Sequence, residues 1–111
     1  MARVASKMLG LLGEEAAVAF LTRRRVHVVG SNVFVARDEI DIIYRSDDGL
    51  TAVEVKTVTG IADPFEAPTD EKIRRLRRAI AGYERPIVAL DAIGVTIGRP
   101  GAEIRWLRAI G

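Results

Sequence analysis

Apolar residues recur along this chain at two spacings, one typical of helices and the other of strands. Residues 5–24 lack proline and carry apolar or small side chains around most of the helical circumference, which predicts a largely buried helix. Residues 69–81 have a narrower apolar stripe with the arginines off it. This pattern predicts a second, amphipathic helix with Thr69 as its N-cap and Gly82 at its end.

Five further stretches have the β-branched content and the period-two alternation that favour strands. A bend or bulge is expected near Gly30, and Asp48-Gly49 predicts a hairpin turn because this pair tolerates positive φ angles. The fourth stretch is expected to be interrupted near Asp91. The predicted strands cover residues 26–36, 39–46, 50–58, 87–98 and 102–109.

The predicted order of elements is α-β-β-β-α-β-β. Three strands joined by short connections form a meander, and a helix then crosses over to two more strands. We therefore expect an α/β fold with a mixed five-stranded sheet flanked by helices, in which the third strand is central. Gly10 and Gly13 in the first helix suggest the close approach of another backbone. With 111 residues and no long polar linker, we expect a single domain over residues 1–111.

Composition excludes several kinds of site. The chain has no cysteine, which rules out disulfides, thiolate metal sites and cysteine nucleophiles, and it has one histidine, which rules out a multi-histidine zinc site within one chain. No stretch approaches the length of a membrane span. Glu14 and Glu15 interrupt the apolar N-terminal run, which argues against a signal peptide. We expect a cytoplasmic protein with no membrane partner.

Glu54 and Lys56 are the first candidates for chemistry. They share one face of the third strand, about 7 Å apart. Charged side chains are rare on a central strand that is covered on both faces, so this pair indicates a functional role. Strict alternation in the second strand groups Glu39, Asp41 and Ile43 on one face. The short connection makes the two strands antiparallel, so Asp41 can approach Glu54. The alternative is an ordinary ion pair on a solvated face.

Glu14 is the third acid, because its helical neighbours are all apolar or small. If Glu14, Asp41 and Glu54 converge, they repel one another without a cation, and a hard ion such as Mg²⁺ or Mn²⁺ resolves this. We expect the metal on Asp41, Glu54 and the Val55 carbonyl, with Glu14 holding a metal-bound water or a second ion. Lys56 would orient or deprotonate the attacking water, or stabilise charge on a phosphate.

The same residues belong to a set of spaced motifs, Gly13-Glu14-Glu15-Ala16-Ala17, Asn32, Glu39-Ile40-Asp41-Ile42-Ile43 and Val53-Glu54-Val55-Lys56-Thr57. These motifs resemble those of the YraN-like family of small bacterial proteins, which is placed in the restriction-endonuclease-like PD-(D/E)xK superfamily. The resemblance implies a restriction-endonuclease-like fold and a metal-dependent endonuclease that hydrolyses phosphodiester bonds in DNA, including branched or structured DNA. It maps the acidic and lysine positions onto Glu14, Asp41, Glu54 and Lys56, with Glu39 as an accessory.

Basic residues of the second predicted helix are candidate nucleic-acid contacts, namely Lys72, Arg74, Arg75 and Arg78. The cluster by itself favours a solvated helix face, and a net charge of +2 is too small to decide. Two alternatives to a nuclease stay open. One is a nucleic-acid-binding protein of the same fold that does not cleave, and the other is a structural protein whose acids form ordinary ion pairs. The resemblance also implies that a homodimer is an option, and a homodimer would double the basic surface.

Overall fold

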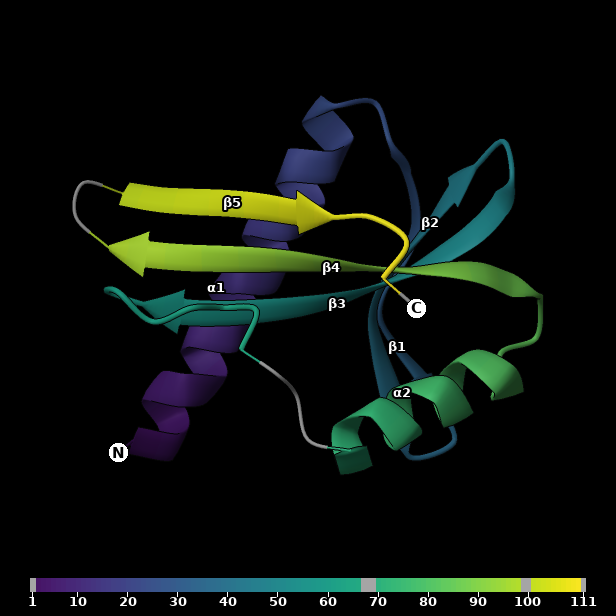
Figure 1. Cartoon of the computed structure of the whole chain (residues 1–111), viewed down its shortest axis with the longest axis horizontal. Coiled ribbons are helices and arrows are strands. Elements are labelled where there is room, and N and C mark those ends of the chain that lie inside the picture. The colour runs from purple at the N-terminus through teal and green to yellow at the C-terminus, as the bar shows by residue number, and fades with distance from the viewer. Residues whose placement is uncertain (1, 67–69, 99–100, 111) are drawn as a thin grey trace.

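Seven elements follow one another in the order that the sequence predicts (Figure 1). The computed structural model describes residues 2–66, 70–98 and 101–110. Thr69, the predicted N-cap, lies outside these residues. The elements are α1 (Ala2–Arg23), β1 (His27–Val35), β2 (Asp38–Ser46), β3 (Gly49–Thr59), α2 (Asp70–Gly82), β4 (Ile87–Gly98) and β5 (Gly101–Leu107).

All five strands belong to one mixed sheet, with the spatial order β1-β2-β3-β4-β5. The β3 and β4 strands are parallel and the other neighbours are antiparallel. The parallel pair exists because α2 carries the chain back to the starting edge before β4 begins. Ser46 pairs with Gly49 across the predicted hairpin turn, where Gly49 has a φ of +127°. The sheet therefore has the predicted topology, with β3 at its centre.

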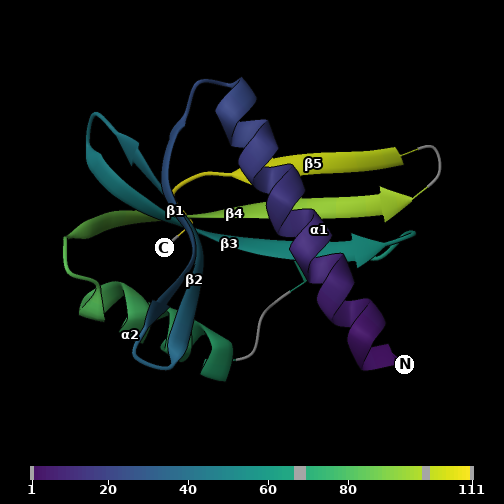
Figure 2. The ribbon, with the colours of Figure 1, turned by 180° about the vertical axis from the view of Figure 1, so that it is seen from behind.

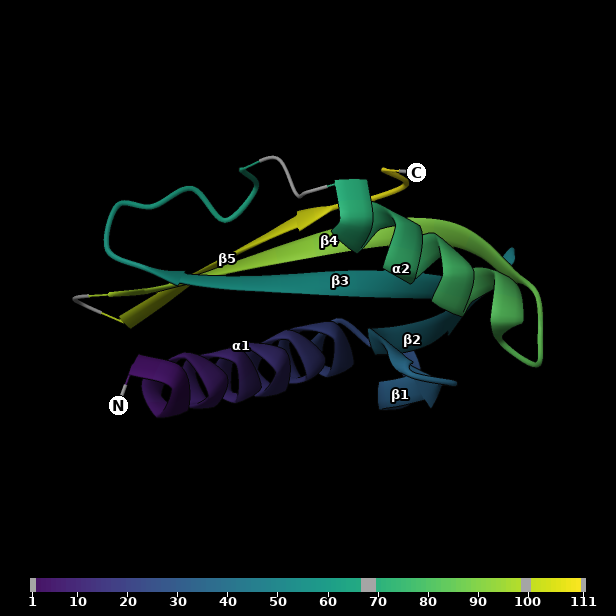
Figure 3. The ribbon, with the colours of Figure 1, turned by 90° about the horizontal axis from the view of Figure 1, so that it is seen from below.

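The two helices cover opposite faces of the sheet (Figure 3). Viewed from behind, α1 runs diagonally across the sheet (Figure 2). Alternation along β3 supplies both cores, because Val53 packs in one cluster with Leu21 of α1 and Ala52 packs in the other with Ala79 of α2. The helices thus cover both faces of β3, and Glu54 on this strand is half-buried.

The contact between α1 and β3 depends on one glycine. A Cβ atom at Gly13 would lie 1.7 Å from Oγ1 of Thr57, so the close approach expected here is confirmed, although a side chain rather than a backbone makes it. At Gly10 the expectation was wrong, since a Cβ there would meet nothing within 4 Å. Neither α1 nor any other helix of the described residues is long and apolar enough to cross a membrane.

The predicted boundaries of elements differ from the observed ones by a few residues. The α1 helix begins at Ala2 rather than at residue 5, and β5 ends at Leu107 rather than at residue 109. The bulge in β1 is confirmed by a register shift between Val28 and Gly30. Boundaries of this kind are set by packing and pairing, which residue propensities do not contain.

The predicted interruption at Asp91 was wrong. The β4 strand continues through this residue, which pairs with Val53 of β3. The buried carboxylate accepts hydrogen bonds from the hydroxyl of Tyr44, from Nε1 of Trp106 at 3.0 Å and from the backbone N–H of Ala109 at 2.7 Å. Three donors satisfy the buried carboxylate of Asp91. This acid, which was expected to interrupt the strand, instead links β4 to β2, to β5 and to the segment after β5.

Candidate metal centre

The site begins where β2 separates from β3. Pairing between these strands runs from Ser46 and Gly49 to Ile42 and Val53. The next pair in this register would be Asp41 with Glu54. In its place, Oδ2 of Asp41 accepts a hydrogen bond from the backbone N–H of Val55 at 2.8 Å. The side chain of Asp41 thus replaces a backbone acceptor at the point of separation.

Strict alternation in β2 was a wrong expectation at this point. Ile40 packs in the same cluster as Ile43, whereas Ile42 packs with Tyr44 in the other cluster. A strand that leaves its ladder can twist more strongly than one that is paired on both sides. The residues before Asp41 therefore present their side chains differently from those after it.

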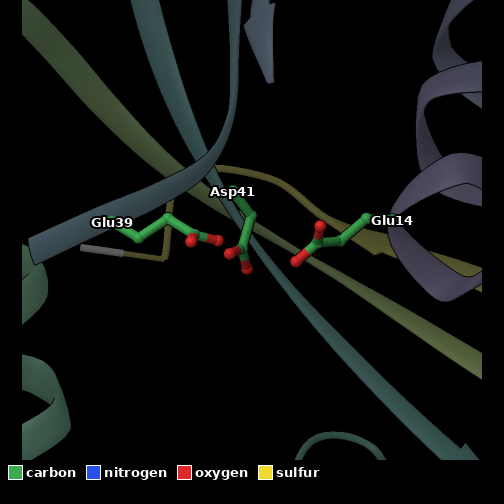
Figure 4. Close-up of side chains that lie close together, drawn as sticks. All are labelled: Glu14, Glu39 and Asp41. Carbon is green, nitrogen blue, oxygen red and sulfur yellow. The ribbon is translucent and has the colours of Figure 1, made fainter. Parts of the chain in front are cut away.

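Three carboxylates meet at this separation (Figure 4). Glu14 reaches it from α1, and Glu39 and Asp41 reach it from β2, with one oxygen of each within 4.8 Å of the others. Glu14 and Asp41 were expected here from the sequence, and Glu39 was ranked only as an accessory. The helix α1 and the strand β2, which supply these side chains, are separated in the sequence by β1 but adjoin in space.

Asn32 supports this triplet, and sequence reasoning gave it no role of its own. Its side-chain amide donates hydrogen bonds to Oε2 of Glu14 and, at 3.3 Å, to Oε1 of Glu39. Asn32 follows the bulge in β1 and has a φ of +50°, a conformation that asparagine tolerates better than most residues. The signals available in the sequence were the bulge itself and the place of Asn32 among the motifs.

Glu54 lines the same cleft but has a different partner. Its Oε1 lies 2.7 Å from Nζ of Lys72, in the first turn of α2. The cleft has a volume of about 720 Å³, and its lining includes Glu14, Glu39, Asp41, Glu54, Val55 and Lys72. Lys56 is exposed and is absent from the described lining residues, although it follows Glu54 by two positions on β3.

Of the other basic candidates, two already hold acids of this chain. Arg75 lines the cleft and pairs with Glu71 at 2.6 Å. Arg78 donates from Nε and Nη2 to the two carboxylate oxygens of Asp38, at 2.7 and 2.9 Å, which holds the pKa of Asp38 below its usual value. Arg74 is exposed. The basic face of α2 is therefore tied in part to neighbouring acids.

The electrostatics of the cleft are unfavourable for Asp41. Burial, followed by the nearby charge of Glu54, raises the pKa of Asp41 to about 8. The charges of Glu14 and Glu39 contribute to this rise, and the hydrogen bond from Val55 limits it. The fold thus places a partly buried carboxylate among three others, an arrangement that a cation would relieve.

The donor set fits a hard divalent cation. Glu14, Glu39 and Asp41 offer carboxylate oxygens from separate side chains, the type of ligand that Mg²⁺, Mn²⁺ and Ca²⁺ prefer. The N–H and C=O of one strand residue point to the same side, so the Val55 carbonyl faces the gap as its N–H does. Asp41 and Val55 thus adjoin each other at this gap, and Glu54 forms an ion pair with Lys72.

The protein is a small α/β protein with a mixed five-stranded sheet and one helix on each face. An acidic cleft opens where β2 separates from β3. Residues 13–95 match the Uncharacterised protein family UPF0102. The chain belongs to this family, and its resemblance to YraN-like proteins is thereby confirmed. The matched residues include Glu14, Glu39, Asp41 and Glu54 of the cleft.

Relatives in this family resemble the chain over most of its length. A UPF0102 protein of Mycobacterium avium is 38% identical over 93% of this chain and 89% of that protein. One from Renibacterium salmoninarum is 36% identical over 93% of this chain and 95% of its own length, and one from Symbiobacterium thermophilum is 38% identical over 86% and 88%. The names of these relatives state no activity, so a function has to be argued from the cleft.

Proposed function

We propose that this protein is a metal-dependent nuclease that hydrolyses phosphodiester bonds in DNA, with Mg²⁺ or Mn²⁺ as its cofactor. Branched or structured DNA is the substrate class that we favour. One observation carries the proposal: Glu14 of α1, Glu39 and Asp41 of β2 and Glu54 of β3 line a single cleft. Burial and the crowding of these charges raise the pKa of Asp41 to about 8. Such an arrangement costs stability unless a cation compensates it.

In this proposal Asp41, Glu14 and Glu39 supply carboxylate oxygens for the ion, and the Val55 carbonyl adds a neutral ligand. A bound ion of this kind polarises a phosphoryl oxygen and lowers the pKa of water. Asn32 keeps the carboxylates of Glu14 and Glu39 in place through its amide. The chain's own contribution is thus a fixed set of oxygens at the separation of two strands.

Nucleic-acid contacts in this proposal come from α2, beside the acids. Two observations support this assignment: Arg75 lines the cleft, and Arg74 is exposed on the same helix. Arg78 is the weakest of these candidates, because both oxygens of Asp38 already accept its hydrogen bonds. Lys56 shares a strand face with Glu54, and its part at the reacting phosphate needs a direct test. A homodimer would add a second basic surface.

Cleavage of a DNA panel tests the proposal. Labelled duplex, single-stranded and four-way-junction DNA are incubated with the protein in Mg²⁺, Mn²⁺ or EDTA. We expect cleavage that requires the metal, and a rate at least about 100-fold lower in Asp41→Asn and Glu14→Gln, because each substitution removes a charged oxygen from the centre. Lys56→Met in the same panel measures the contribution of that lysine.

Glu15→Gln is the matched control, since Glu15 is an exposed acid adjacent to Glu14 on the same helix. This variant should cleave like the wild type. Equal residual cleavage by the wild type, Asp41→Asn and Glu14→Gln would point to a contaminating nuclease and would sink the proposal. Metal-dependent DNA binding with no cleavage of any substrate would support the non-cleaving alternative.

A further inference from the structure

Glu54 differs from the three acids of the proposed metal centre because it forms an ion pair with a lysine of the protein. Among the described residues, the group of three carboxylates with oxygens within 4.8 Å of one another consists of Glu14, Glu39 and Asp41. The nearest cation to Glu54 is the ammonium of Lys72, 2.7 Å from Oε1. Yet Glu54 directly precedes Val55, whose backbone holds Asp41. It is therefore beside the proposed centre but turned to a positive charge of the protein.

The ion pair between Lys72 and Glu54 is suited to exchange. The two side chains retain 44% and 22% of their exposure, so water screens the attraction and the pair is weak. The lysine side chain is a compact charge on a flexible four-carbon stem, which can turn without moving the helix. Lys72 lies in the first turn of α2, at the wall of the cleft.

A divalent ion at Asp41 would change this balance. It would attract the carboxylate of Glu54, the acid whose charge acts most strongly on Asp41. The ammonium of Lys72 and the ion would repel each other in the same partly buried cleft, and they would compete for one carboxylate. A phosphate of a nucleic acid entering the cleft would then offer Lys72 an alternative anion.

We propose that Lys72 is a displaceable counter-ion of this centre. It holds Glu54 while the centre lacks its metal, and it moves to a backbone phosphate when Glu54 turns to the ion. This inference rests on the proposed function and assigns Lys72 a role different from that of a permanent phosphate contact. It also makes occupation of the metal centre and binding of nucleic acid mutually dependent.

Metal affinity provides the first test, because it does not require cleavage. Free Mn²⁺ is measured by electron paramagnetic resonance during titration of the wild type, Lys72→Met, Lys72→Arg and Arg77→Met. Lys72→Met keeps the length of the side chain without its charge, and it should bind Mn²⁺ about two- to fivefold more tightly because Glu54 is released. Lys72→Arg keeps the ion pair and should match the wild type.

Arg77→Met is the matched control for general electrostatics. Arg77 is exposed on α2, and its substitution also removes one positive charge from this helix. Any general attraction of cations to a less basic protein will be seen in this variant too. We expect Arg77→Met to bind Mn²⁺ with an affinity close to that of the wild type. Lys72→Met should bind Mn²⁺ clearly more tightly than Arg77→Met.

DNA affinity provides the second test. Fluorescence anisotropy of a labelled four-way junction is followed in EDTA and in Ca²⁺, which is chosen to occupy the centre without supporting cleavage. In EDTA, Lys72 is held by Glu54, so Lys72→Met should weaken binding less than twofold. In Ca²⁺ the same substitution should weaken binding about threefold or more, because a phosphate contact is lost.

Two results would overturn the inference: binding of Mn²⁺ by Lys72→Met that is no tighter than by Arg77→Met, or an equal loss of DNA affinity in Ca²⁺ and EDTA. If Lys72 had only a structural role, Lys72→Met would bind Mn²⁺ more weakly than the wild type and would have a lower melting temperature. If both expected changes occur without any cleavage, the role of Lys72 stands and the nuclease assignment fails. If the protein cleaves DNA without these changes, the nuclease assignment stands and the role of Lys72 fails.

Discussion

Asp41 is subject to two opposing effects on its protonation state, the hydrogen bond from Val55 and its burial among other acids. As the acceptor of the Val55 N–H it should be ionised, because a charged acceptor makes the stronger hydrogen bond. Burial and the neighbouring acids favour the protonated form instead, and they prevail, since the pKa of Asp41 is raised to about 8. Without a cation, the protein at neutral pH therefore has to hold a proton at this position.

This conflict predicts a dependence of stability on pH. The folded-state pKa of about 8 lies above the ordinary value of 3.8, so between these limits the folded state holds more protons than the unfolded state. Stability contributed by protonated Asp41 is therefore lost as pH rises through this window. In EDTA, the free energy of unfolding should fall between pH 5 and pH 8 by at least about 1 kcal/mol more in the wild type than in Asp41→Asn.

Urea denaturation at pH 5, 6.5 and 8 measures this difference. Glu15→Gln, which changes an exposed acid of α1, should keep the slope of the wild type. Parallel pH profiles for the wild type and Asp41→Asn would contradict the assignment of the raised pKa to Asp41.

At the scale of elements, the packing of α1 on β3 fixes the distance between Glu14 and the strands. Gly13 lies directly before Glu14 in the chain and against Thr57 of β3. The absence of a side chain at Gly13 lets the helix approach closely enough for the carboxylate of Glu14 to join those of β2. A glycine that weakens the helix by propensity thus strengthens the site by position.

The two glycines of α1 should respond to alanine in opposite directions. Gly13→Ala should destabilise the protein by about 1–3 kcal/mol, because the new methyl group would collide with Thr57. Gly10→Ala should stabilise it by up to about 1 kcal/mol, since this position is open and alanine is the better helix former. Thermal and urea denaturation of both variants measure the two effects.

Thr57→Ala in the Gly13→Ala background completes the cycle. It removes the hydroxyl that lies nearest to the new methyl group, so part of the lost stability should return. No recovery in the double variant, or equal effects of the two alanines, would show that α1 does not rest on β3 through this contact.

At the scale of the whole molecule, the proposed centre joins two layers, the helix α1 and the sheet. Glu14 comes from α1, whereas Glu39 and Asp41 come from β2. A ligand that ties these layers together binds the folded state alone. Its binding should therefore appear as an increase in the stability of the entire fold.

We expect Mg²⁺ or Mn²⁺ at millimolar concentration to raise the melting temperature by several degrees, as an ion at about 100 times its dissociation constant contributes about 2.7 kcal/mol. The increase should be larger at pH 8 than at pH 5, because protons compete with the ion for Asp41. Differential scanning fluorimetry with and without EDTA measures the shift.

NaCl at matched ionic strength controls for general screening and should leave the melting temperature nearly unchanged. Asp41→Asn should lose most of the increase caused by the divalent ion. An increase of the same size in the wild type and in Asp41→Asn would locate the bound ion elsewhere on the protein.

The sequence by itself determined the order of the elements, the hairpin turn at Gly49, the bulge near Gly30 and the central place of β3. These features follow from local periodicity and turn chemistry, which are read directly from neighbouring residues. It also identified Glu14, Asp41 and Glu54 as acids out of place in apolar surroundings. What it could not supply was their partners, because those come from distant parts of the chain.

Tertiary structure alone decided which acids meet. Strict alternation failed at Ile40, which packs with Ile43 where β2 separates from β3, and Glu39 proved to be a full member of the triplet with Glu14 and Asp41. Glu54 is not part of the triplet but forms an ion pair with Lys72. This lysine lies 18 residues further along the chain, on α2. Register, strand separation and side-chain pairing are long-range properties of the packed chain, so local patterns in the sequence do not contain them.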